Sequence, residues 1–115
     1  MDVSAEMVVD GQLTAYRVRD LGDFLAFYAP DVRVRDFVGT VLMDGVEAMR
    51  GQYGPLFRDS PNLRVDIPHR IVVGDYVIDE EQISGFILEG FPDTMRVAVA
   101  YRVQDGLIEE VVLFT

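Results

Sequence analysis

Hydrophobic positions follow a helical period in the first half of the chain and a period of two in the second half. Apolar residues that recur every three or four positions predict helices over residues 4–19, 20–31 and 44–62. Ser4 and Asp20 are the expected N-caps of the first two helices. The third opens with Asp44 and Glu47 at the spacing of a capping box, and Gly54–Pro55 is expected to kink or interrupt it.

Alternation of apolar and polar residues predicts the strands. The first strand is expected over residues 32–39, and residues 38–43 are expected to form a turn with a short returning strand. Further strands are expected over residues 63–73, from residue 76 onward, over 95–103 and over 107–115. Gly74–Asp75 and Asp105–Gly106 have the composition of two-residue hairpin turns. The apolar residues of the last strand do not alternate cleanly, which predicts a bulge or burial of both faces. Burial of both faces would require a partner, so we expect a homodimer through the outer face of the last strands.

The hairpin that turns at Gly74–Asp75 pairs His69 with Glu80. The face that carries His69 is the more apolar one, so we expect it to look toward the helices, with Asp79 and Glu81 facing outward beside Arg70. His69 and Glu80 would then form either an acid–base pair inside the fold or a structural cross-strand pair. The connection over residues 85–93 carries apolar residues that either fold over a pocket mouth or pack against the core.

The order of elements defines the fold class. Helices come first, then a short strand pair, a helix and an antiparallel meander, with no repeat or linker. Half of the 115 residues are apolar, which suits one core. We therefore predict a single α+β domain over residues 1–115, with a curved sheet wrapped around helices.

Composition restricts the chemistry to carboxylates, tyrosines, arginines and one histidine. The chain contains no cysteine, and its ten basic residues are all arginine, which excludes thiolate and Schiff-base lysine chemistry. His69 alone cannot build a multi-histidine metal site, and we expect no metal and no cofactor.

Charge and hydropathy restrict the partners. The net charge of −10 argues against binding to nucleic acid or to an anionic membrane surface. The sequence shows neither a spanning hydrophobic run nor the pattern of a secretion signal, so the expected location is the cytoplasm.

The strand over residues 32–39 holds the candidate base. Asp36 stands near its end, before Phe37 and Gly39. A carboxylate that points from a strand into an apolar cavity has a raised pKa and can act as a general base. The alternative is a strand-end turn residue that faces water.

Several segments together resemble the nuclear transport factor 2-like superfamily, within it the SnoaL-like and ketosteroid-isomerase-like branch. They are residues 12–16, 19–21, 24–31, 34–39, 45–53, 101–103 and 105–108. The resemblance implies a cone-shaped curved antiparallel sheet wrapped around N-terminal helices. It does not imply one function, since the superfamily contains isomerases, cyclases, dehydratases, hydrolases and non-enzymes.

The resemblance also implies roles for individual residues. Asp36 matches the general base of ketosteroid isomerases, and Tyr53 matches a supporting pocket tyrosine. The two oxyanion-hole positions hold Gln12 and Val99 here, so a usual steroid isomerase is not expected; Tyr16, one turn beyond Gln12, is a possible substitute. The resulting hypothesis assigns catalysis to Asp36, Tyr16 and His69, and ligand binding to Gln12, Tyr28, Tyr53, Glu80, Val99 and Tyr101.

The predicted function is binding of a small, mostly apolar organic molecule. If the protein is an enzyme, we expect a cofactor-independent isomerase, cyclase or lyase that transfers a proton with Asp36 as base. The alternative is a non-catalytic ligand-binding or dimerisation module of the same fold.

Overall fold

The computed structural model describes residues 3–86 and 93–115. Its helices are α1 (Ala5–Arg17), α2 (Leu21–Leu25) and α3 (Val46–Asp59). Its strands are β1 (Tyr28–Asp36), β2 (Val41–Asp44), β3 (Arg64–Val73), β4 (Tyr76–Ser84), β5 (Thr94–Gln104) and β6 (Leu107–Phe114). These strands form one sheet in the order β2-β1-β6-β5-β4-β3, antiparallel except where β1 lies beside β6.

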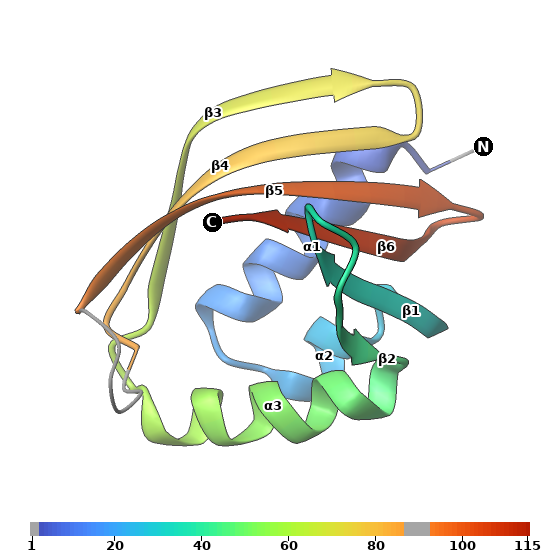
Figure 1. Cartoon of the computed structure of the whole chain (residues 1–115). Coiled ribbons are helices and arrows are strands. Elements are labelled where there is room, and N and C mark those ends of the chain that lie inside the picture. The colour runs from blue at the N-terminus through green and yellow to red at the C-terminus, as the bar shows by residue number, and fades with distance from the viewer. Residues whose placement is uncertain (1–2, 87–92) are drawn as a thin grey trace.

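The sheet bends around the helices, as the fold class predicted. Figure 1 shows the long strands β3, β4 and β5 curving over α1, with α3 at the bottom, on the side away from these strands. α1 packs against β3 to β6, and α3 packs against β1, β2 and α2. The apolar core lies between the sheet and the helices. No helix within the described ranges is long and apolar enough to cross a membrane.

The first two helices begin where predicted, but the second ends early. Ser4 caps α1 by accepting a hydrogen bond from the Met7 amide at 3.1 Å, and Asp20 caps α2 in the same way. The prediction that the second helix runs to residues 30–31 is wrong, because β1 begins at Tyr28. Tyr28 is buried and pairs with Ile108 of β6, so tertiary pairing overrides the local helical pattern.

The third helix lacks the predicted capping box. Gly45 occupies the N-cap position with φ of 91°, and no side chain caps the helix. Asp44 instead ends β2 and forms an ion pair with Arg33, while Glu47 pairs with Arg50. The left-handed backbone at this position, which glycine adopts without strain, turns the chain from the sheet into the helix. α3 continues through Pro55.

Both hairpin turns are confirmed. Gly74–Asp75 joins β3 to β4 in the predicted register, with Ile71 opposite Ile78 and His69 opposite Glu80. Asp105–Gly106 joins β5 to β6, and the predicted irregularity of the last strand is a register shift next to Val103. Of the connection predicted over residues 85–93, residues 87–92 lie outside the described part of the chain.

The predicted faces of the β3–β4 hairpin are wrong. The register shifts between Asp66 and His69, around Pro68, so one extra residue lies on β3. Such a bulge exchanges the two faces of a strand beyond it, and edge strands tolerate proline there. Val65 faces inward as expected, but beyond the bulge His69 faces outward and Arg70 faces α1.

Arg70 faces inward and links α1 to the sheet through hydrogen bonds to acidic residues on both. Arg70 makes two hydrogen bonds to Asp79, from Nε to Oδ1 at 2.6 Å and from Nη2 to Oδ2 at 2.9 Å. Its Nη1 donates to Asp10 of α1 at 2.6 Å and lies 3.5 Å from a Glu6 carboxylate oxygen. Asp79 is completely buried, and the paired charges compensate for its removal from water.

Candidate active site

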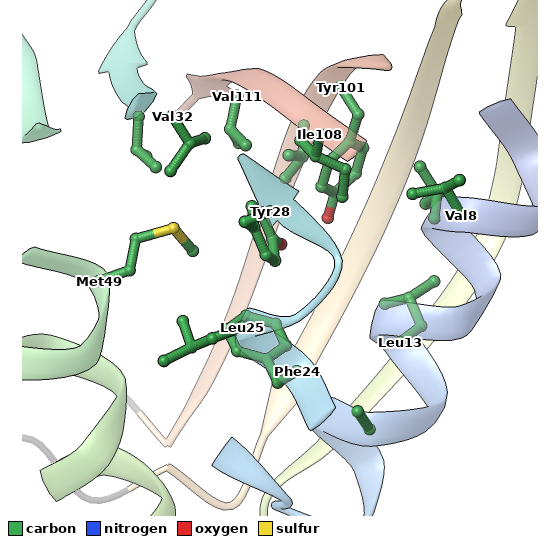
Figure 2. Close-up of a cluster of buried hydrophobic side chains, with 14 of the residues drawn as sticks. Val8, Leu13, Phe24, Leu25, Tyr28, Val32, Met49, Tyr101, Ile108 and Val111 are labelled. Carbon is green, nitrogen blue, oxygen red and sulfur yellow. The ribbon is translucent and has the colours of Figure 1, made fainter. Parts of the chain in front are cut away.

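A cavity of about 140 Å³ lies between the concave face of the sheet and the helices. Most of its wall is aliphatic or aromatic, with side chains from all three helices and from β1, β3, β4, β5 and β6. Figure 2 shows part of this wall, where Tyr28 and Tyr101 lie with Phe24, Met49 and Val111 between the layers. The polar side chains that line the cavity are those of Gln12, Tyr16, Tyr28, Tyr53, Glu81, Tyr101 and Thr115.

Glu81 is the acidic residue of the cavity wall. It lies on β4 with 8% of its surface exposed, and its Oε2 accepts a hydrogen bond from the Tyr101 hydroxyl at 2.7 Å. Burial raises the pKa of Glu81 to about 7, although the Tyr101 hydrogen bond opposes the shift. Oε1 has no hydrogen-bond partner among the described residues. The carboxyl group can therefore take up or release a proton near neutral pH within an apolar space.

Gln12 and Tyr28 form a second polar pair in the wall. The Tyr28 hydroxyl donates to Gln12 Oε1 at 2.9 Å, and Gln12 Nε2 donates to the Val9 carbonyl at 3.1 Å. Both side chains are buried. Their mutual bonds satisfy polar groups that would otherwise be costly to bury, so this pair is held in place before any ligand arrives.

Tyr16 and Tyr53 add two further hydroxyls. Their rings meet edge to face with centroids 6.4 Å apart, and both pack against Phe24 and Phe57. Burial raises the pKa of Tyr53 to about 12, and the nearby Glu81 charge adds to the shift. Burial also raises the pKa of Tyr16, and the charges of Tyr53 and Glu81 add to that shift. Neither hydroxyl has a hydrogen-bond partner among the described residues. Both hydroxyls stay protonated at neutral pH and remain able to donate.

Six of the residues that the sequence assigned to a site line the cavity: Gln12, Tyr16, Tyr28, Tyr53, Val99 and Tyr101. Asp36 is not among the lining residues. Its Oδ1 accepts hydrogen bonds from the Val38 and Thr40 amides at 3.1 and 2.9 Å, which closes the β1–β2 turn. Asp36 lies opposite Leu113, a cavity residue, so strand alternation places it on the concave face beyond the cavity end.

His69 and Glu80 lie on the outer face, away from the cavity. His69 Nδ1 and Glu80 Oε1 are 2.7 Å apart, and Arg96 binds the other oxygen of Glu80. The His69 hydrogen bond, with Arg96, lowers the pKa of Glu80. Of the two alternatives for His69 and Glu80, this geometry is that of a structural cross-strand pair and not that of an acid–base pair inside the fold. The bulge near Pro68 turns the His69 side of β3 outward.

Sequence reasoning placed Glu81 outside, and the pairing of β4 with β5 is the feature that places it inside. Glu81 lies opposite Val97, and Asp79 lies opposite Val99. Since residues opposite each other share a face, these partners carry both carboxylates to the buried side. The register between the two strands could not be derived, because the long connection over residues 85–93 leaves it undetermined.

The described residues contain no group of three or more histidine or acidic side chains that could hold a metal ion. The ionisable side chains in the described cavity wall are the Glu81 carboxyl and the hydroxyls of Tyr16, Tyr28, Tyr53 and Tyr101. A carboxylate that titrates near pH 7, beside hydroxyl donors in an apolar space, is suited to moving a proton on a bound organic molecule.

Solved structures with the same fold confirm the architecture. An uncharacterized cystatin-fold protein from Novosphingobium aromaticivorans is 19% identical over 99% of this chain and 100% of its own, with a TM-score of 0.87. A proposed polyketide cyclase from Sinorhizobium meliloti is 19% identical over 92% of both chains, with a TM-score of 0.74. A hypothetical protein with a ketosteroid-isomerase-like fold from Catenulispora acidiphila, in complex with trimethylamine, is 21% identical over 98% of this chain and 87% of its own, with a TM-score of 0.68.

Comparison at the level of sequence families gives a direct assignment. No curated protein shows a significant match to the chain. The model of the SnoaL-like domain matches residues 9–111, which is most of the sequence, in agreement with the resemblance in its motifs. The chain belongs to the family of SnoaL-like domains.

Proposed function

We propose that the protein binds a small, mostly apolar organic molecule in the cavity and transfers a proton on it, with Glu81 as the general base. The observation that carries this proposal is the buried carboxyl group of Glu81, which lines the cavity and is held by Tyr101 at 2.7 Å. Its pKa of about 7 provides both protonation states near neutral pH, as a group that accepts and then returns a proton requires.

The proposed reaction begins with a ligand that carries a carbonyl group. The bond between hydrogen and the carbon next to the carbonyl breaks, and the proton passes to Glu81 Oε1. The electron pair of that bond moves toward the carbonyl oxygen, which forms an enolate. Tyr16 or Tyr53 stabilises the enolate by donating a hydrogen bond. Return of the proton to the same carbon completes an exchange. In a ligand with a carbon–carbon double bond next to that carbon, the enolate is a dienolate, and return of the proton to its far end shifts the double bond and completes an isomerisation.

The comparisons support a small organic ligand in a general sense. One structural neighbour is a proposed polyketide cyclase and another holds trimethylamine, so similar folds accommodate molecules of this kind. The resemblance of the strand around Asp36 to that of ketosteroid isomerases implies Asp36 as an alternative base. Its position on the concave face, opposite Leu113, keeps this alternative open for a ligand that extends beyond the cavity.

Hydrogen–deuterium exchange of a small ketone such as cyclohexanone, followed by NMR in D₂O, tests the proposal directly. The protein is expected to accelerate exchange next to the carbonyl, and Glu81→Gln is expected to slow it by roughly 10² to 10⁴-fold. Glu80→Gln is the matched control, since the neighbouring carboxyl faces outward, and should retain the rate.

Asp36→Asn separates the two candidate bases. A large loss in Asp36→Asn with little loss in Glu81→Gln would transfer the role to Asp36. Exchange no faster than in buffer, for the wild type itself, would favour the non-catalytic ligand-binding module.

We also propose a homodimer, but through the outer face of β3 and β4 rather than the outer face of the last strands that was expected from the sequence. Ile78 is 37% exposed on the outer face, between Ile71 and Ala100, and Tyr76 is half exposed nearby. An apolar surface of this kind commonly marks a protein contact. Sedimentation velocity at micromolar concentration should give a dimer for the wild type and a monomer for Ile78→Asp; a monomeric wild type would contradict the proposal.

A further inference from the structure

The volume of the cavity limits the size of its ligand. An apolar cavity of about 150 Å³ accepts one benzene ring, and this cavity measures about 140 Å³. Met49 and Val34 in its wall are almost fully buried, so they belong to the packed core and cannot move aside without disturbing it. Other wall residues, Ile83, Met95 and Leu113, are only half-buried, so the cavity is open on one side. A ligand with two or more fused rings therefore exceeds the volume of the cavity itself and would have to project from its mouth.

The electrostatics of the cavity limit the charge of its ligand. None of the described residues in the wall is arginine or histidine. Arg17 and Arg70 act on Glu81 from a distance, but Arg17 donates to the Val65 carbonyl and Arg70 is bound to Asp79 and Asp10. An anionic ligand would meet the Glu81 carboxyl without a compensating cation, at a large cost in desolvation.

A cationic ligand is also disfavoured. The Glu81 carboxyl already accepts the Tyr101 hydroxyl, and burial favours its neutral form. A cation would have to leave water for an apolar space and keep the carboxyl ionised there. An uncharged oxygen function avoids both costs, since the hydroxyls of Tyr16 and Tyr53 can donate to it.

From the volume, the wall and these hydroxyls we propose that the ligand is a neutral single-ring compound with one oxygen function, oriented toward the Glu81 and tyrosine end of the cavity. This proposal rests on the proposed function for the location of the site, and it adds the substrate class. It predicts that a polycyclic compound does not fit within the cavity.

Isothermal titration calorimetry with a matched pair of alcohols tests the size limit. Benzyl alcohol is expected to bind at least ten-fold more tightly than 1-naphthalenemethanol. The direction is diagnostic, because the larger apolar surface of the naphthyl compound would favour it at an unrestricted site. Equal or tighter binding of the naphthyl compound overturns the proposal, as does failure of benzyl alcohol to bind.

An enlarged cavity gives the complementary test. Leu113 lines the cavity, whereas its neighbour Val112 faces the other side of the sheet. Leu113→Ala is expected to improve binding of 1-naphthalenemethanol at least ten-fold, and Val112→Ala should leave it unchanged. If Leu113→Ala fails to fold, Ile83→Ala, in the same wall, replaces it. An equal response in the Val112→Ala control overturns the assignment of the ligand to this cavity.

A charge series with one ring tests neutrality. At pH 7, benzyl alcohol is expected to bind at least ten-fold more tightly than either benzoate or benzylammonium. Tighter binding of benzylammonium, increasing above pH 7 as Glu81 ionises, would identify a cation site and overturn the proposal.

The two proposals fail separately. Selective binding of benzyl alcohol with exchange that does not depend on Glu81 would leave the ligand class standing and remove the proposed reaction. Glu81-dependent exchange with tight naphthyl binding would do the reverse.

Discussion

Two neighbouring carboxyl groups on β4, Glu80 and Glu81, have opposite chemistry. Glu80 faces the outer side of the sheet, where His69 and Arg96 lower its pKa. Glu81 faces the cavity, where burial raises its pKa to about 7. The two residues are chemically identical and adjacent in the chain, so the difference comes entirely from the side of the sheet that each one faces.

The ion pairs on the two faces of the sheet also differ in burial. Inside, Arg70 holds the completely buried Asp79 with two hydrogen bonds and reaches Asp10 of α1. Outside, His69 and Glu80 pair at 2.7 Å on a surface where the His69 side chain is 83% exposed. Buried charges that lose a partner are strongly destabilised, whereas water replaces the partner of an exposed one. The inner pair therefore supports the fold, and the outer pair contributes little.

Removing the inner arginine should have the largest effect on stability. Arg70→Met preserves most of the aliphatic volume but leaves the Asp79 carboxyl buried without its partner. We expect a loss of about 3–5 kcal/mol in the free energy of unfolding, measured by urea denaturation. Arg64→Met, on the same strand with an exposed pair to Asp66, is the matched control. Similar losses in both variants would show that burial of the inner pair is unimportant.

The pH dependence of stability should differ in sign between the two carboxyl groups. The folded-state pKa of Glu81 lies above its ordinary value of 4.5, so the folded state holds more protons than the unfolded state between pH 4.5 and 7. Its contribution to stability therefore falls as the pH rises through this window, by up to about 3 kcal/mol.

The pKa of Glu80 is lowered, so its contribution is present above pH 4.5 and is lost as the pH falls. Urea denaturation of the wild type, Glu81→Gln and Glu80→Gln from about pH 3 to 8 checks both signs. Glu81→Gln should become more stable relative to the wild type as the pH rises. If the free energy of unfolding of Glu81→Gln changed with pH in parallel with that of the wild type, the Glu81 carboxyl would have its ordinary pKa.

Tyr101→Phe should change the pKa of Glu81 at the inner site and leave the outer pair of His69 and Glu80 unchanged. The Tyr101 hydroxyl favours the ionised form of Glu81, so its removal should raise the pKa of Glu81 further, by roughly one pH unit. The midpoint of the pH–rate profile for ketone exchange should move upward from about 7. A lower maximal rate with an unchanged midpoint would assign Tyr101 a purely structural role.

The smallest effect is expected on the outer face. His69→Ala removes an exposed side chain and should barely change the midpoint of thermal unfolding or the rate of ketone exchange. It should nevertheless raise the pKa of Glu80, since the His69 hydrogen bond is the largest influence lowering it. NMR titration of the carboxyl carbon checks this shift; a large loss of exchange activity would return His69 to the mechanism.

Local patterns in the sequence predicted elements that depend on near neighbours. The Ser4 cap, the third helix and the two hairpin turns are confirmed, because capping, helical periodicity and turn composition act over a few residues. Tyr28 was assigned to a helix and lies in a strand. Its pairing partner, Ile108, stands at the other end of the chain.

The sequence by itself determined the α+β class, because alternation and helical spacing encode which side chains are buried. The cavity and part of its wall, including Gln12, Tyr53 and Val99, followed from the resemblance of the sequence motifs to a known family. Tertiary structure alone decided which acid enters that cavity. One extra residue near Pro68 reverses the faces of β3 beyond it, and the register of β4 on β5 carries Glu81 to the inside. Since side chains on a strand alternate with a period of two, a shift of a single residue determines whether a carboxyl group meets water or the cavity.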